Sequence, residues 1–165
     1  MKKHVFLLAV CFWAALFMGS GAGAESILVI SDTHLTKETQ DHAAMMQAVA
    51  EAARGRDAVL LLGDNTNNTH GEEHALVLQW AQEIREQTGA EVYVLPGNHD
   101  YGARTGPEEF SALYRAWGWD QAFSRDEATA GYAVMTRQGT CLIMLDTNRL
   151  DEAHAVQPDS GIGGS

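Results

Sequence analysis

The chain has 165 residues, a length that suits a single domain. Its 22 acidic residues outnumber 11 basic ones, which gives a formal net charge of −11 at neutral pH. This acidic balance argues against bulk nucleic acid as a partner, because contacts with phosphate need a basic surface.

The beginning of the chain has the features of an export signal. Lys2 and Lys3 precede an apolar run over residues 5–18, and the small residues 22–24, Ala-Gly-Ala, form an A-x-A cleavage pattern. The apolar run is shorter than the roughly 18–20 residues that span a membrane. We therefore predict a signal peptide over residues 1–24, a secreted or periplasmic location, and no stable membrane span after cleavage.

Cleavage changes the charge and the cysteine content of the remaining domain. Residues 25–165 keep 9 basic against 22 acidic residues, a net charge of −13, because only Lys2 and Lys3 are lost. Cys11 leaves with the signal, so Cys141 has no internal disulfide partner. Its apolar surroundings, "TCLIML", predict a small buried side chain rather than a reactive thiol.

Three segments of the mature chain read as strands. Residues 26–31 and 58–63 are continuous apolar runs that predict strands buried on both faces. Residues 91–97, "EVYVLPG", predict a third strand. Near the end, residues 131–148 predict two further strands joined by a turn at Gln138-Gly139.

Apolar residues recur with helical spacing between the first three strands. The apolar face of the first predicted helix, over residues 41–54, carries Met45, Val49 and Ala52. The second predicted helix ends near Gly89, and its apolar face carries Val77, Trp80, Ala81 and Ile84. A shorter third helix is predicted over residues 107–117. Alternating strands and helices predict βαβ units and an α/β fold with a largely parallel sheet.

Polar residues with metal-binding chemistry follow all three predicted parallel strands. The first strand is followed by Asp32 and His34, which project the same way if that loop stays extended, and the second is followed by Asp64. The third is followed by Asn98, His99 and Asp100. Parallel strands bring these ends to one edge of the sheet, where functional groups gather. Carboxylates, imidazoles and an amide oxygen suit Mn, Fe or Zn.

The segments "DTH", "GDN" and "GNHD", in this order and each after an apolar strand, resemble the first three signature motifs of the calcineurin-like metallophosphoesterases. The resemblance covers about residues 26–148. It implies a layered α/β/β/α sandwich, of which residues 25–165 would form the N-terminal βαβαβ portion. It also implies two divalent metal ions and a small phosphate mono- or diester as substrate, hydrolysed by a water molecule that the two metals activate.

The resemblance assigns a role to each motif residue. It implies that Asp32 and His34 bind the first metal, that Asp64 bridges both metals and that Asn98 binds the second. It implies two catalytic residues that are not ligands. His99 would assist the leaving group, and Asp100 would orient His99 and tune its charge.

The later family motifs, a further lone His and then G-H-x-H, do not occur in the chain. We therefore expect residues 25–165 to be the N-terminal part of the domain, incomplete at its C-terminus. His154 lacks such a context and is interpreted as a surface residue.

Two alternative functions remain open from the sequence. "HGEEH" fits the H-x-x-E-H pattern of inverted zinc proteases, with His70, Glu73 and His74 as the relevant side chains. The same segment could instead simply be the charged start of a helix, since acidic residues are favourable in a first turn. The second alternative is an inactive exported metal-binding module.

Overall fold

The computed structural model describes residues 24–36, 42–102, 105–126 and 128–148. Two three-stranded sheets form its centre. The first is parallel, in the order β1 (Ile27–Ile30), β2 (Ala58–Leu62) and β3 (Glu91–Leu95). The second is antiparallel, in the order β4 (Ser124–Arg125), β5 (Tyr132–Met135) and β6 (Cys141–Met144). The helical segments are α2 (His42–Ala53), α3 (Gly71–Thr88), η1 (Asn98–Asp100), α4 (Pro107–Leu113) and η2 (Arg115–Trp117).

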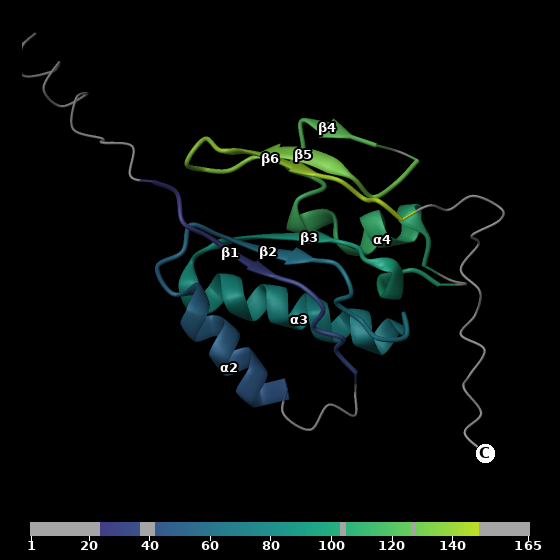
Figure 1. Ribbon diagram of the computed structural model, residues 1–165, viewed down its shortest axis with the longest axis horizontal. Coiled ribbons are helices and arrows are strands. Elements are labelled where there is room, and N and C mark those ends of the chain that lie inside the picture. Colours follow the sequence, from purple (N-terminus) through teal and green to yellow (C-terminus); the bar gives the residue numbers. More distant parts are fainter. Residues whose placement is uncertain (1–23, 37–41, 103–104, 127, 149–165) are drawn as a thin grey trace, which may run out of the picture.

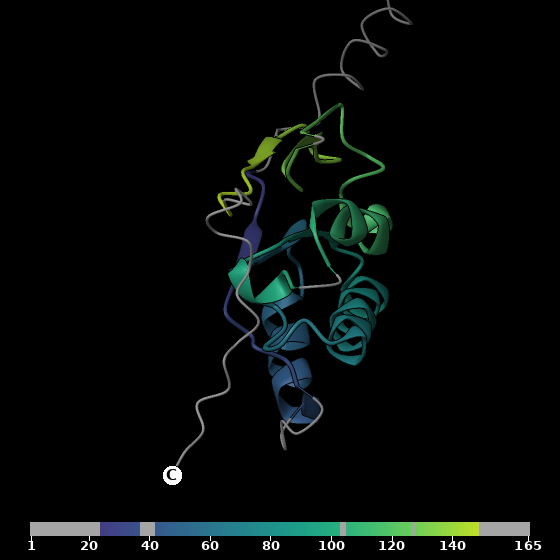
Figure 2. The ribbon, with the colours of Figure 1, turned by 90° about the vertical axis from the view of Figure 1, so that its right-hand side faces the viewer.

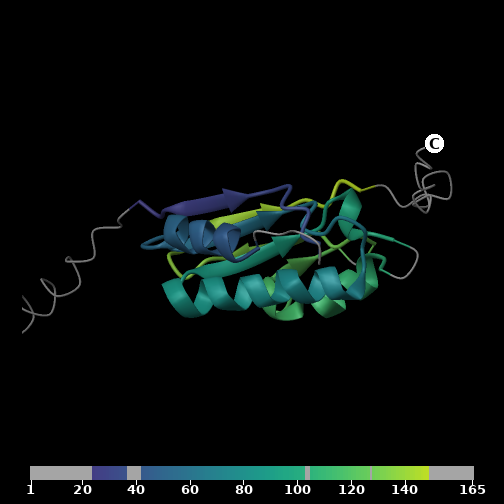
Figure 3. The ribbon, with the colours of Figure 1, turned by 90° about the horizontal axis from the view of Figure 1, so that it is seen from below.

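The predicted α/β fold with a parallel sheet is confirmed. Helices α2 and α3 lie on one side of the β1–β2–β3 sheet, and the antiparallel sheet lies on the other (Figure 1). The view from below has α3 in front of the sheets (Figure 3). Figure 2 shows α4 close to α3, and the His74 ring of α3 contacts Phe110 of α4 at 6.3 Å between ring centroids. This arrangement matches the N-terminal βαβαβ portion of a metallophosphoesterase sandwich.

Strand alternation gives the parallel sheet two buried faces. In β2, Val59 and Leu61 belong to the core under the helices, whereas Leu60 belongs to the core between the sheets. The helix side is filled by the four predicted residues of α3, all buried: Val77, Trp80, Ala81 and Ile84. The inter-sheet side is filled mainly by Tyr93, Tyr132, Val134 and Met144. Both faces of β2 are therefore covered, as predicted.

The first strand and the first helix depart from the prediction in their details. β1 is an edge strand, and Val29 is 56% exposed, because β1 pairs only with β2 among the described strands. The fully buried face of α2 carries Met46, Ala50 and Ala53, and Ala52 is exposed. An alanine-rich helix offers overlapping apolar stripes at helical spacing, so the sequence pattern does not choose between them.

The prediction for Cys141 is wrong, because its side chain is exposed. In β6 the side chains alternate, so Met144 points into the inter-sheet core whereas Cys141 and Ile143 face outward. A continuous apolar run indicates a strand but does not show that both faces are covered.

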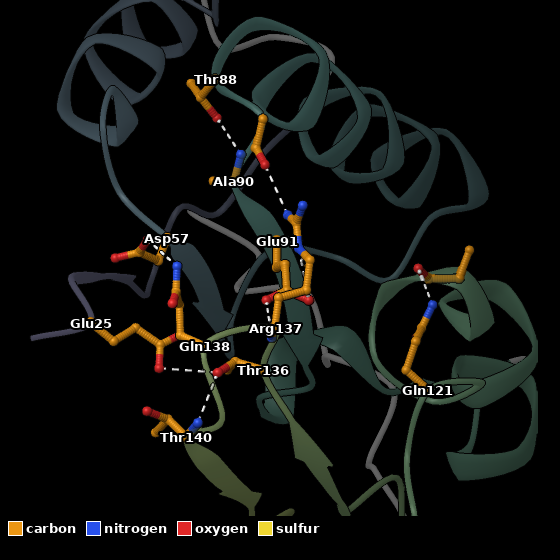
Figure 4. Close-up of polar contacts among 12 residues, drawn as sticks. Glu25, Asp57, Thr88, Ala90, Glu91, Gln121, Thr136, Arg137, Gln138 and Thr140 are labelled. Carbon is orange, nitrogen blue, oxygen red and sulfur yellow. Dashed lines mark hydrogen bonds and ion pairs between the residues drawn. The ribbon is translucent and has the colours of Figure 1, made fainter. Parts of the chain in front are cut away.

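Polar contacts tie the β5–β6 turn to the amino ends of the parallel strands (Figure 4). The Arg137 amide donates to Glu91 at 2.7 Å, and the two side chains form an ion pair at 3.3 Å. Thr136 donates to Glu25 at 3.0 Å. Gln138 donates to Asp57, whose pKa is lowered chiefly by the hydrogen bond from the Ser26 amide. These contacts set how the two sheets face each other.

Tyr132 links the two sheets at their centre. Its buried hydroxyl donates to the carbonyl oxygens of Val94 at 3.0 Å and Trp117 at 3.3 Å. We expect Tyr132→Phe to lower the free energy of unfolding by about 1–3 kcal/mol, because two buried carbonyls lose their donor. Denaturant unfolding measures the change. Met135→Leu, on the exposed side of the same strand, is the control and should shift stability by less than about 0.5 kcal/mol; equal stability of both variants would contradict the expected effect.

Two predictions fall wholly or largely outside the described residues: the signal peptide over residues 1–24 and the surface position of His154. Within the part of the chain that the structure describes, no helix is long and apolar enough to cross a membrane.

Candidate metal centre

The arrowheads of β1, β2 and β3 point to the same end of the sheet (Figure 1). Past β1 and β2, the loops continue the parallel pairing through backbone hydrogen bonds. The Asp32 amide donates to the backbone carbonyl of Gly63 at 3.0 Å, and the His34 amide donates to the backbone carbonyl of Asp64 at 3.0 Å. The Leu35 amide donates to the backbone carbonyl of Asn65 at 2.8 Å. The pairing places the first two motifs side by side.

Asp32, His34 and Asp64 converge at this edge. One ligand atom from each lies within 4.8 Å of the others, and the described residues contain no other such group of three or more His, Cys, Asp or Glu. His34 Nδ1 is buried without a hydrogen-bond partner. Two carboxylates so close together repel each other, and a divalent cation would offset that repulsion. The donor set and the unpaired imidazole nitrogen therefore fit a divalent metal.

The backbone at this cluster is unusual. Asp32, His34 and Asp64 have φ angles of 57°, 43° and 47°, in the left-handed region that non-glycine residues rarely adopt. The loop at Asp32 and His34 is therefore not extended, and the condition under which their side chains would project the same way is not met. Residues in this region cost about 1–3 kcal/mol each and cluster at functional sites. Here the strained backbone brings the side chains of two loops to one point.

Gly97 lets the third loop approach the cluster. A Cβ atom at this position would lie 2.2 Å from Asp64 Oδ1 and 2.3 Å from the Asp64 amide nitrogen. Its φ of −102° is open to any residue, so close approach and not backbone conformation requires glycine. Gly63 faces Gly97 across the gap, with its own Cβ position 3.1 Å from the Gly97 Cα. The glycines of the second and third motifs, Gly63 and Gly97, therefore permit contact between the loops after β2 and β3.

Asn98 and His99 follow directly in η1. The His99 amide donates to Asp64 Oδ1 at 3.0 Å, so η1 begins in contact with Asp64, the residue expected to bridge the two metals. Asn98 is exposed at the first position of this turn. The His99 ring meets the His34 ring edge-on, with 4.8 Å between centroids. His99 Nδ1 lies 2.8 Å from the carbonyl oxygen of Asn67, which can only accept, so Nδ1 carries the proton.

Asp100 was predicted to orient the His99 ring, but its carboxylate has other hydrogen-bond partners. Asp100 is fully buried, and both oxygens of its carboxylate accept hydrogen bonds. Oδ2 accepts from the amides of Asn65 and Gly97, at 3.1 and 2.9 Å, and from the Asn65 side chain at 3.1 Å. Oδ1 accepts from the amide and hydroxyl of Thr66, at 2.8 and 3.0 Å. Asp100 thus ties the loop after β2 to the loop after β3, and the partner that orients His99 is Asn67.

A second carboxylate fastens the end of β6 to the same region. Asp146 accepts hydrogen bonds from the Tyr101 hydroxyl at 2.5 Å and from the Ala130 amide at 3.0 Å. Burial raises the pKa of Tyr101 above its usual range, so the phenol stays protonated as a donor. Asn148 donates to the Pro96 carbonyl at 3.4 Å, just before the third motif. No motif in the sequence predicts a role for these residues.

The three residues of the peptidase pattern do not form a metal group. His70 is exposed at the start of α3. Glu73 is only 4% exposed and accepts hydrogen bonds from the loop before it. His74 is 2% exposed, and its Nδ1 shares a hydrogen bond of 2.9 Å with the Tyr114 hydroxyl. Burial lowers the pKa of His74, which keeps the ring neutral. Glu73 and His74 are therefore buried and hydrogen-bonded to other residues, and the structure does not support a zinc peptidase.

The comparison with known families agrees with this geometry. A model of the calcineurin-like phosphoesterases matches residues 25–152. The chain belongs to the calcineurin-like phosphoesterase family. No curated protein gives a match. Family membership makes this calcineurin-like phosphoesterase a candidate hydrolase of phosphate esters, with Asp32, His34 and Asp64 as its candidate metal group.

Proposed function

We propose that this calcineurin-like phosphoesterase is an exported, metal-dependent hydrolase of small phosphate mono- or diesters. Asp32, His34 and Asp64 would hold one divalent ion, and Asp64 and Asn98 would take part in holding a second. The identity of the ions is open among Mn, Fe and Zn, because carboxylate, imidazole and amide donors suit all three. The export signal predicted over residues 1–24 supports action outside the cytoplasm.

The observation that carries the proposal is the convergence of Asp32, His34 and Asp64 to within 4.8 Å at the carboxyl ends of adjacent parallel strands. The chain has a formal net charge of −11. An anionic phosphate ester needs a local cationic centre to approach such a surface, and bound metal ions would provide it.

The protein's own groups would orient the substrate and deliver a proton. Bound divalent ions would supply charge neutralisation at the phosphate and a lower pKa for a water molecule. The His99 ring lies beside His34, with Nδ1 held by the Asn67 carbonyl. In the doubly protonated ring Nε2 also carries a proton, and it would give that proton to the leaving oxygen as the phosphorus–oxygen bond breaks, which leaves a neutral ring with its proton on Nδ1. The same positioned ring would stabilise negative charge on that oxygen.

Hydrolysis assays on a protein that carries the complete family domain test the proposal. The substrates are p-nitrophenyl phosphate, bis(p-nitrophenyl) phosphate and a peptide, each with Mn²⁺, Fe²⁺ or Zn²⁺ and with a chelator. Metal-dependent release of nitrophenol that the chelator abolishes would support a phosphoesterase. Metal binding without turnover would indicate the inactive module, and peptide cleavage would indicate a peptidase; either result would overturn the proposal.

A further inference from the structure

Glu73 is a buried carboxylate that serves the loop between β2 and α3. Its Oε2 accepts from the backbone amides of Asn67 at 3.2 Å and Asn68 at 2.7 Å. Its Oε1 accepts from the Asn68 side-chain amide at 3.2 Å. A carboxylate that is only 4% exposed needs such donors, because an unpaired buried charge is costly. The arrangement fixes this loop firmly to the first turn of α3.

The loop in turn holds His99. The Asn67 carbonyl accepts from His99 Nδ1 at 2.8 Å, and the Asn68 N–H donates to Glu73 at 2.7 Å. These two groups belong to the same peptide unit, which is planar and has its C=O and N–H pointing in opposite directions. The planar Asn67–Asn68 peptide group therefore lies between the Glu73 carboxylate and the His99 imidazole. Any rotation of this peptide group moves the Asn67 carbonyl oxygen, which orients the His99 ring.

We propose that Glu73 is a positioning residue that fixes the His99 ring through the Asn67–Asn68 peptide. The inference rests on the proposed function, in which His99 serves the leaving group. A carboxylate on the N–H side also polarises the peptide and makes its carbonyl a stronger acceptor. Glu73 itself touches neither the ligand cluster nor His99 in the described contacts. Its role gives the "HGEEH" segment a purpose other than metal binding.

Glu73→Ala tests the proposal in the full-length protein. We expect kcat to fall by about 10- to 10²-fold, the scale of a displaced catalytic group, with KM and metal content unchanged. Glu73→Gln should restore most of the rate, because its carbonyl oxygen can still accept both backbone amides and its NH₂ can face a flipped Asn68 side chain. Glu86→Ala, an exposed position on the same helix, is the control and should leave kcat unchanged.

A double-mutant cycle separates positioning from general destabilisation. If Glu73 acts through His99, adding Glu73→Ala to His99→Ala should change kcat by no more than about twofold. The same loss in both backgrounds would overturn the proposal. If the alanine variant does not fold, Glu73→Asp replaces it in the cycle, because it keeps the charge but shortens the reach to the peptide.

A spectroscopic measurement keeps this inference separate from the proposed function. In the metal-free protein, ¹⁵N-histidine NMR should show a slowly exchanging Nδ1–H signal that His99→Ala removes. We expect that proton to exchange faster in Glu73→Ala and to behave as in the wild type in Glu73→Gln. If no phosphate ester is hydrolysed but this pattern holds, the function is wrong and the positioning stands. An unchanged signal in Glu73→Ala would overturn the positioning.

Discussion

His99→Ala is expected to lower kcat for phosphate-ester hydrolysis by about 10²- to 10⁴-fold, the usual effect of removing a general acid or base. The His99 ring lies beside His34 and is oriented by the Asn67 carbonyl, so it is placed at the cluster. Its hydrogen bond to Asp64 comes from the backbone amide, which alanine keeps. Metal content should therefore stay close to that of the wild type.

Steady-state kinetics and elemental analysis of the same preparations check this result. His70→Ala is the matched control, because His70 is exposed at the start of α3 and its side chain makes no capping hydrogen bond. The control should keep full activity. Loss of metal from His99→Ala would mean that the ring is itself a ligand and that the division of roles is wrong.

Gly97→Ala is expected to abolish activity and to weaken metal binding. The new methyl group would lie 2.2 Å from Asp64 Oδ1, so either the Asp64 side chain or the loop after β3 must move. Overpacking of this kind costs about 1–3 kcal/mol of stability, and the shift falls on the shared ligand. Thermal unfolding, metal titration and hydrolysis assays measure the three effects.

Gly71→Ala is the control for this substitution. No atom lies within 4 Å of its Cβ position at the first turn of α3, so alanine should be neutral or stabilise the helix by up to about 1 kcal/mol. A Gly97→Ala protein with wild-type metal affinity and activity would show that the loops after β2 and β3 need not touch.

The site could be found from the sequence because strand ends carry its residues. Apolar runs predicted β1, β2 and β3, and parallel pairing places the residues that follow them at one edge. Asp32, His34 and Asp64 were predicted to meet there, and the structure brings them to within 4.8 Å. Their left-handed φ angles could not be predicted, because backbone strain is imposed by contacts between loops.

The partners of the third motif could not be read from adjacency. Asn98, His99 and Asp100 occupy one turn of 3₁₀ helix, in which successive side chains point about 120° apart. One is exposed, one faces the His34 ring, and one is buried against the loop after β2. Neighbours in sequence therefore have separate partners, and Asp100 cannot also reach the His99 ring from the interior.

The role of Glu73 was hidden for a different reason. Its neighbours His70 and His74 complete a zinc-protease pattern, which predicts metal binding that the structure does not support. A signal for the true role was present: a polar loop, "DNTNNTHG", precedes a helix whose first turn is acidic. Only the hydrogen bonds from Asn67 and Asn68 to Glu73 show which loop groups the carboxylate holds.

We expect Asp64 to be a ligand shared by two metal ions at the carboxyl ends of β1, β2 and β3. The most direct test of this expectation is the number of divalent ions bound per chain, measured by isothermal titration and elemental analysis, in the wild type, Asp64→Ala and Glu86→Ala. In a protein that carries the complete family domain, the account predicts two ions in the wild type and in the Glu86→Ala control, which removes an exposed carboxylate. Asp64→Ala should lose at least one of them. Wild-type stoichiometry and affinity in Asp64→Ala would contradict the account.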